Sequence, residues 1–269
     1  MHPVIHLLLV SLAVICSIMF LVWVWGTSIH NYSIVDVFWA FNFAVIAGII
    51  YFFADGNETR KIIVCALALL WSLRLGTYLT TRVFSHLDVE EGRYNQLRKE
   101  WSNNLNLKFF FFFQSQALSN VLLALPYFII ATNKNPEISV VEYIGATMWF
   151  ISIIAEGISD FQLNQFKKDP ANKEKVCSVG LWNYSRHPNY FFQLMIWISV
   201  LIFALPNPYG WIAIICPLSI GYLIFKVTGI PMTEEQSIRS KGDAYLEYQK
   251  TTSVFIPWFP LSPKGELKK

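Results

Sequence analysis

The 269-residue sequence is poor in charge. Asp, Glu, Lys and Arg make up only 14% of its residues, against about 25% in an ordinary soluble domain, and this excludes a soluble globular protein and a disordered chain. It also lacks a cysteine framework, because its four cysteines are scattered and form no Cys-x-x-Cys pair, so neither a disulfide scaffold nor a zinc site is indicated. The net charge of +3 is too small to predict a nucleic-acid partner.

What the chain has instead is seven long apolar runs. A helix needs about 17–25 apolar residues to cross a bilayer core of about 30 Å, and each run has that length. We therefore expect an all-α, polytopic membrane bundle of about seven transmembrane helices, forming one domain over residues 1–269. The runs are Val4–Trp25, Ile34–Phe53, Ile62–Thr81, Phe109–Ala131, Ile138–Ser159, Tyr190–Pro206 and Tyr209–Phe225.

The basic residues between these runs predict an orientation. Residues 82–108, 160–189 and 230–269 carry 16 of the 21 Lys and Arg residues. Because basic loops stay in the cytoplasm, we expect these two loops and this tail to be cytoplasmic, with the N-terminus outside. The expected location is the inner membrane of a bacterium or the endoplasmic reticulum of a eukaryote, with membrane lipids as partners.

Ionisable residues within the apolar runs are candidates for function, because such groups are costly in a bilayer. Asp36 is one of them. Another set follows a helical spacing of four, four and three residues, which places its members on one face: Glu156, Asp160, Asn164 and Lys167. This stripe indicates either the wall of an aqueous cavity or a purely structural seam between helices.

The segment 180–190, Gly-Leu-Trp-Asn-Tyr-Ser-Arg-His-Pro-Asn-Tyr, precedes the sixth run and concentrates donors, acceptors and aromatic rings. Arg186 offers a bidentate fork to phosphate, and the aromatic residues offer faces to a ring. Pro188 disfavours helix in the residue before it, so Arg186 and His187 are expected on a turn at the start of a helix. The pattern favours a site for a phosphorylated heteroaromatic ligand over an ordinary loop at the membrane interface.

With this segment, three others resemble one known family: residues 33–39, residues 91–94, and the ending from Tyr248 to residues 255–258. Together they resemble the steroid 5-alpha-reductase-like membrane family, and more narrowly its prokaryotic-type branch DUF1295. The resemblance implies a lipid-metabolism oxidoreductase with seven helices, whose cytoplasmic half binds NADPH. Its implied reaction is reduction of an enone-like C=C bond in a hydrophobic small molecule, a lipid or steroid-like substrate held in the membrane.

The same resemblance implies which residues bind the cofactor and which does the chemistry. Asp36 is the best remaining acid for catalysis, because residues 39–43 read Trp-Ala-Phe-Asn-Phe and lack the glutamate that steroid reductases carry in an early helix, while Trp71 stands near the position of their tyrosine. No metal is implied. The implied cofactor-binding residues are Arg93, Asp160, Lys167, Tyr184, Arg186, His187, Asn189, Tyr190, Glu235 and Tyr248.

Two other hypotheses stay open. The Arg186–Tyr190 turn and the later pair Glu234-Glu235 are shared with membrane methyltransferases of the isoprenylcysteine and phospholipid type, which use S-adenosylmethionine. In a third interpretation the chain is a transporter or scaffold that kept the fold and binds neither ligand.

Overall fold

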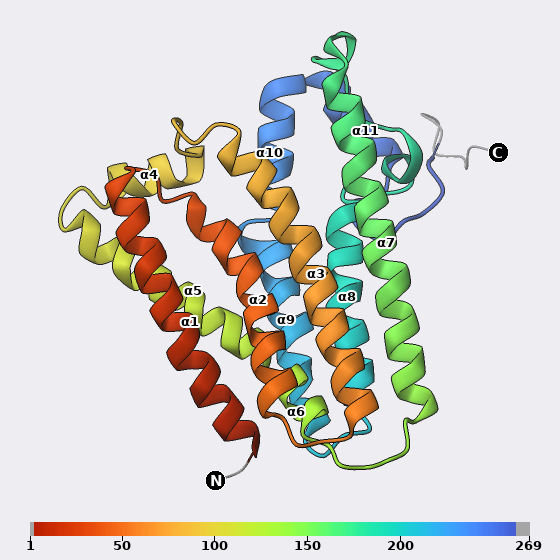
Figure 1. The fold of residues 1–269 in the computed structure, drawn as a ribbon. Coiled ribbons are helices and arrows are strands. Elements are labelled where there is room, and N and C mark those ends of the chain that lie inside the picture. The colour runs from red at the N-terminus through yellow and green to blue at the C-terminus, as the bar shows by residue number, and fades with distance from the viewer. Residues whose placement is uncertain (1–2, 262–269) are drawn as a thin grey trace. The chain divides into compact units, whose positions relative to one another are not determined.

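The computed structural model describes residues 3–261, and within that range it contains helices and no strands (Figure 1). The predicted all-α class is therefore confirmed. The last eight residues of the predicted tail 230–269 lie outside the described residues.

In the described part of the chain, six helices are long and apolar enough to cross a membrane. The sixth predicted run forms a shorter apolar helix, α8 (Pro188–Ala204), of 17 residues, about 26 Å at 1.5 Å per residue. The count of seven spans and their orientation stay predictions.

The chain forms two compact units. Unit 1 comprises Met1–Ser139 and Ala204–Ile212, and unit 2 comprises Val140–Phe203 and Ala213–Lys269. The single domain over residues 1–269 stays a prediction.

In the part of the chain that the structure describes, the α-helices of unit 1 are α1 to α6. Polar side chains tie α2 to its neighbours: Ser72 Oγ donates to the carbonyl of Ala40 at 2.7 Å, and Asn42 Nδ2 donates to Asn120 Oδ1 at 2.8 Å. Pro126 follows the break between α5 and α6, as expected of a residue that cannot donate its backbone N–H within a helix. The helices are α1 (Pro3–Ser28), α2 (Ile34–Phe53), α3 (Glu58–Phe84), α4 (Gly92–Glu100), α5 (Leu105–Leu123) and α6 (Leu125–Ala131).

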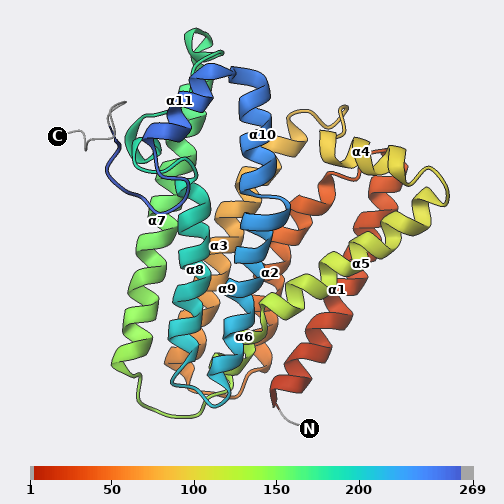
Figure 2. The ribbon, with the colours of Figure 1, turned by 180° about the vertical axis from the view of Figure 1, so that it is seen from behind.

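Unit 2 places α7, α8 and α9 side by side, with α10 and α11 at the end where α7 stops and α8 begins (Figure 2). The π-helix η4 and Gly229 separate α9 from α10. The elements are α7 (Val140–Lys168), η1 (Pro170–Asn172), η2 (Gly180–Asn183), α8, η3 (Gly210–Ile214, shared with unit 1), α9 (Ile215–Tyr222), η4 (Leu223–Val227), α10 (Ile230–Lys241) and α11 (Asp243–Thr251).

Two side-chain hydrogen bonds join α7 to α8. Asn189 Nδ2 donates to Asp160 Oδ1 at 3.2 Å. One turn further along both helices, the Gln193 amide, oriented so that both of its groups are satisfied, donates to Glu156 Oε1 at 2.9 Å. Burying a polar side chain costs free energy unless the side chain is hydrogen-bonded. These two hydrogen bonds therefore fix the register of the two helices. The predicted polar stripe on α7 is thus partly an interhelical seam.

A glycine allows the chain to turn after α7. Gly180 has φ +56°, and a Cβ there would lie 2.1 Å from Gln162 Nε2. Gln162 Oε1 in turn accepts from the backbone N–H of Leu181 at 2.9 Å. Only glycine adopts this conformation readily, and the turn it forms brings the segment 180–187 back over the end of α7.

Candidate functional site

The candidate site is a cavity of about 450 Å³ in unit 2, within the range of about 300–1,000 Å³ usual for ligand pockets. It lies among the end of α7, the loop after it, the turn before α8, and helices α10 and α11. Its lining residues are Leu163, Phe166, Lys167, Asn172, Lys173, Lys175, Val176, Cys177, Trp182, Arg186, His187, Thr233, Gln236, Ser237, Ser240, Lys241, Tyr245 and Tyr248.

The cavity is strongly basic. Arg186 and the lysines Lys167, Lys173, Lys175 and Lys241 contribute to its wall, and among the described lining residues there is no aspartate or glutamate. Lysine and arginine are the usual partners of phosphate groups in proteins. The cavity therefore suits a polyanionic ligand.

The remaining wall divides into a polar side and an aromatic side. On α10, Thr233, Gln236, Ser237 and Ser240 follow a helical spacing of three and four residues and all line the cavity. Phe166, Trp182, Tyr245 and Tyr248 supply rings. Hydroxyl and amide groups suit a sugar, and aromatic rings suit a heteroaromatic base.

Arg186 joins the turn before α8 to the C-terminal helices. Its Nε donates to Glu234 Oε1 at 2.7 Å, and its Nη1 donates to the carbonyls of Gln249 and Thr252 at 2.8 and 3.1 Å. The side chain is only 11% exposed. Arg186 is therefore a structural clamp as well as a cation in the cavity wall.

His187 is buried beside this ion pair, with 1% of its surface exposed. Its Nε2 lies 3.2 Å from Glu234 Oε1, and its ring stacks on Tyr190 with centroids 5.4 Å apart and planes at 6°. Desolvation lowers the pKa of His187, against an opposing effect of its bond with Glu234. The ring is therefore neutral near pH 7.

The C-terminal segment is fixed to the same turn by backbone bonds. Arg186 N donates to the carbonyl of Ser253, and Trp258 N donates to that of Tyr184, both at 2.8 Å. The Tyr248 hydroxyl donates to the carbonyls of Trp182 and Ser185, and burial raises the pKa of Tyr248. Tyr248 thus stays a donor that holds α11 against the turn.

The structure brings together part of the predicted site. Lys167, Arg186, His187 and Tyr248 line the cavity. Asp160 and Asn189 pair with each other at the start of α8, and the Tyr190 hydroxyl lies 3.1 Å from Thr233 Oγ1, a residue of the cavity wall.

Five predicted residues of unit 2 do not line the cavity: Asp160, Asn189 and Tyr190, whose contacts are given above, and Tyr184 and Glu235. Tyr184 is exposed and contacts Phe259 edge to face. Glu235 is exposed on α10 and pairs with Arg239 at 2.7 Å. Its neighbour Glu234 joins the site instead, because consecutive helical residues point about 100° apart.

The two remaining predicted residues belong to unit 1. Asp36 Oδ1 accepts from the Tyr94 hydroxyl at 2.7 Å and lies 3.4 Å from Arg93 Nη2, while Arg82 Nη2 lies 3.6 Å from its Oδ2. Tyr94 is fully buried, and desolvation raises its pKa. In this group Asp36 accepts hydrogen bonds, and the hydroxyl that carries a proton belongs to Tyr94. The structure therefore shows Asp36 as an acceptor, and its role as the catalytic acid stays a prediction.

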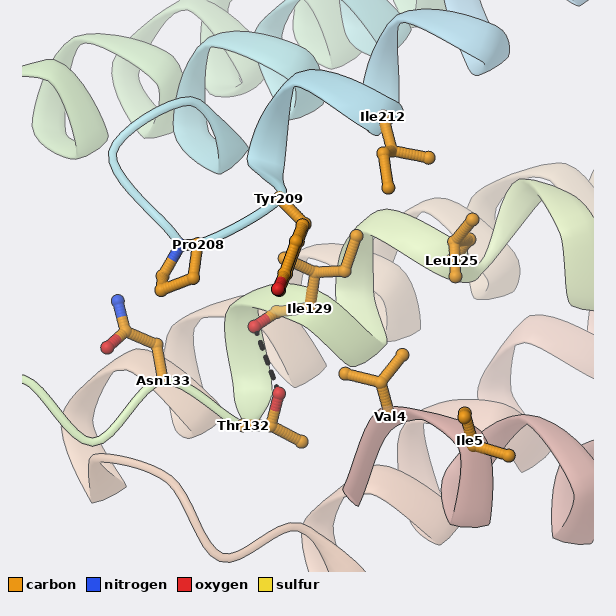
Figure 3. Close-up of a pocket in the computed structure, with 9 residues that line it drawn as sticks. All are labelled: Val4, Ile5, Leu125, Ile129, Thr132, Asn133, Pro208, Tyr209 and Ile212. Atoms are coloured by element: carbon orange, nitrogen blue, oxygen red, sulfur yellow. Dashed lines mark hydrogen bonds between the residues drawn. The ribbon is translucent and has the colours of Figure 1, made fainter. Parts of the chain in front are cut away.

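Unit 1 has a second, smaller cavity of about 250 Å³ (Figure 3). Most of its wall is apolar, with Val4, Leu125 and Ile212 among the lining residues. The Thr132 hydroxyl is already bonded to the carbonyls of Phe128 and Ile129. This cavity offers little beyond an apolar surface, and the basic cavity of unit 2 is the candidate functional site.

Comparison with known proteins gives one match. The family model described as "Protein of unknown function (DUF1295)" matches residues 22–252, which include all the residues that line the basic cavity. Neither the curated proteins nor the solved structures contain a match.

Proposed function

This chain belongs to the DUF1295 family, and we propose that it is an integral membrane oxidoreductase that uses NADPH to reduce an enone-like C=C bond in a lipid or steroid-like substrate. The membrane-type helical bundle supports a substrate taken from the bilayer. The motif resemblance to steroid 5-alpha-reductase-like enzymes supports the reaction class.

The charge of the unit 2 cavity is the observation that carries this proposal. One arginine and four lysines line it, without a carboxylate among the described lining residues. NADPH carries a diphosphate and a further phosphate on one ribose, whereas S-adenosylmethionine carries a positive sulfonium and no phosphate. Since like charges repel across a few ångströms of low-dielectric space, this wall favours the phosphorylated ligand.

The residues of this chain would divide the work by chemistry. The lysines and Arg186 would hold phosphates, the hydroxyl and amide groups of α10 would contact sugar, and the aromatic side would exclude water from the bound ring. When bound, NADPH supplies the hydride for the reduction. Asp36 of unit 1 remains the predicted catalytic acid, and it would need a proton of its own for that role, because its Oδ1 accepts from the Tyr94 hydroxyl.

A membrane methyltransferase is the second candidate, and one observation favours it. The turn shared with those enzymes meets one residue of the shared glutamate pair in space, because Arg186 and His187 both contact Glu234. The ligand would then be S-adenosylmethionine, bound in the same cavity.

Thermal melting of the purified full-length protein in detergent, with NADPH, NADH and S-adenosylmethionine side by side, tests the proposal. A ligand at 100 times its Kd stabilises the folded state by about 2.7 kcal/mol, so the true ligand raises the melting temperature. We expect the largest rise with NADPH. A rise with S-adenosylmethionine alone would establish the methyltransferase instead, and no rise with any of the three would favour a transporter or scaffold.

A further inference from the structure

Glu234 receives hydrogen bonds on both carboxylate oxygens. Oε1 accepts from Arg186 Nε at 2.7 Å and lies 3.2 Å from His187 Nε2, and Oε2 accepts from Gln249 Nε2 at 2.9 Å. The Tyr245 hydroxyl reaches Oε1 at 3.5 Å. A carboxylate has only acceptors, so the bond with His187 requires the proton to be on Nε2.

That proton position determines what the other ring nitrogen can do. A neutral imidazole protonated at Nε2 has a lone pair on Nδ1. Among the residues that the structure describes, none bonds to Nδ1 of His187, and the residue lines the cavity. The stacked ring of Tyr190, itself held by Thr233, fixes the orientation of the imidazole.

We infer that Glu234 is a positioning residue that acts through His187, presenting Nδ1 as a hydrogen-bond acceptor to an O–H or N–H group of the ligand in the cavity. The lysines are donors and require acceptors such as phosphate oxygens, whereas Nδ1 requires a donor. The cavity therefore distinguishes two parts of its ligand: phosphates lie at the lysines, and a ribose hydroxyl or carboxamide N–H lies at His187. The choice of NADPH as probe rests on the proposed function.

The nitrogen resonances of His187 test the first half of this inference without any ligand. The full-length protein is labelled with ¹⁵N-histidine in detergent micelles, and the variant H187Q identifies the His187 signals among those of the five histidines. We expect Nε2 protonated and Nδ1 unprotonated at neutral pH. E234Q should weaken this preference: because Arg186 Nε donates to the same oxygen as His187, the glutamine carbonyl takes its place, and a neutral amide oxygen accepts less strongly than a carboxylate. E235Q is the matched control, since Glu235 is exposed and paired with Arg239, and it should leave the tautomer unchanged.

The wild-type spectrum decides the positioning role even if E234Q fails to fold. A proton on Nδ1, or an even mixture of tautomers, would overturn it.

Titration with NADPH tests the second half. We expect the Nδ1 resonance to shift on binding, and E234Q to raise the Kd roughly fivefold while E235Q does not, since one hydrogen bond contributes about 1 kcal/mol. NADPH that binds without moving the Nδ1 resonance would overturn the inference and leave the proposed function intact. NADPH that does not bind at all would contradict the proposed function, and the ligand-free spectra would still decide the role of Glu234.

Discussion

Arg186 and Glu234 form an ion pair with Nε and Oε1 2.7 Å apart, although 48 residues separate them in the chain. Their side chains are only 11% and 16% exposed. The pair joins the turn before α8 to α10, and Arg186 extends the link to α11 through the carbonyl of Gln249. The basic cavity thus depends on a link that is itself largely buried.

Removing this arginine should destabilise unit 2. R186A leaves Glu234 without its cation, and breaking a buried ion pair on one side costs about 3–5 kcal/mol. The control is R239A, because Arg239 and Glu235 also lie 2.7 Å apart but are 76% and 70% exposed. Exposed pairs contribute little. Chemical denaturation in mixed micelles measures both changes, and equal losses in the two variants would contradict the clamp.

The lysines should act on ligand affinity and not on folding. K173Q and K175Q should each weaken NADPH binding by about fivefold, since two unit charges 4 Å apart in water interact by about 1 kcal/mol. The loss should shrink at high salt, because ions screen exposed charges. K250Q is the control in the same unit, since Lys250 pairs with Glu247 and does not line the cavity. Isothermal titration calorimetry measures the affinities, and a K250Q variant that bound NADPH as weakly as K173Q or K175Q would contradict the role of the cavity lysines.

Close packing of α7 on α8 should tolerate no added methyl group at Gly145. A Cβ there would lie 2.6 Å from the backbone nitrogen of Phe203, and overpacking costs about 1–3 kcal/mol. At Gly221 in α9 the nearest atom would be 3.8 Å away, so G221A should be neutral or stabilising by about 0.5–1 kcal/mol. Melting temperatures of G145A and G221A check this, and a stabilised G145A would be inconsistent with the observed contact.

Stability should fall on mild acidification because of His187. Burial lowers the pKa of its imidazole below 6.5, while Glu234 and Arg186, the charged groups facing it, act in opposite directions. The unfolded chain therefore binds a proton that the folded chain resists, and stability is lost as the pH falls below about 6.5, by at most about 1.4 kcal/mol per pH unit. The melting temperature should depend less on pH between about pH 7 and pH 5.5 in H187Q than in the wild type. H86Q, which alters an exposed histidine, should keep the wild-type dependence. An unchanged slope in H187Q would refute this account.

Much of the architecture follows from local sequence. Apolar runs of membrane length predict the helices, and the spacing of Glu156, Asp160 and Lys167 predicts one face of α7. That face then serves two purposes in the structure: two carboxylates bond to α8, and the lysine lines the cavity. The pattern could not separate them, because spacing gives the face of a helix but not what packs against it.

Contacts between distant segments could not be predicted in the same way. Of two consecutive glutamates, the phase of α10 selects Glu234, and that phase depends on where α10 begins, after its N-cap residue Gly229. The pairing of Ser253 with Arg186 uses backbone groups that every residue has, so no side-chain signal marks it. That Arg93 binds the cofactor stays a prediction of the resemblance; its contacts with Asp36 and Tyr94 in unit 1 were not foreseen.

The most direct test of the central claim is equilibrium binding of NADPH to the full-length protein in nanodiscs, followed by energy transfer from tryptophan to the reduced nicotinamide. Trp182 lies in the cavity wall, so bound NADPH should quench protein fluorescence saturably and in a salt-dependent way. The account predicts much weaker binding by the combined K173Q/K175Q/K241Q variant and unchanged binding by K250Q. Absence of saturable transfer in the wild type, or equal affinity of the combined variant, would contradict a dinucleotide site in this basic cavity.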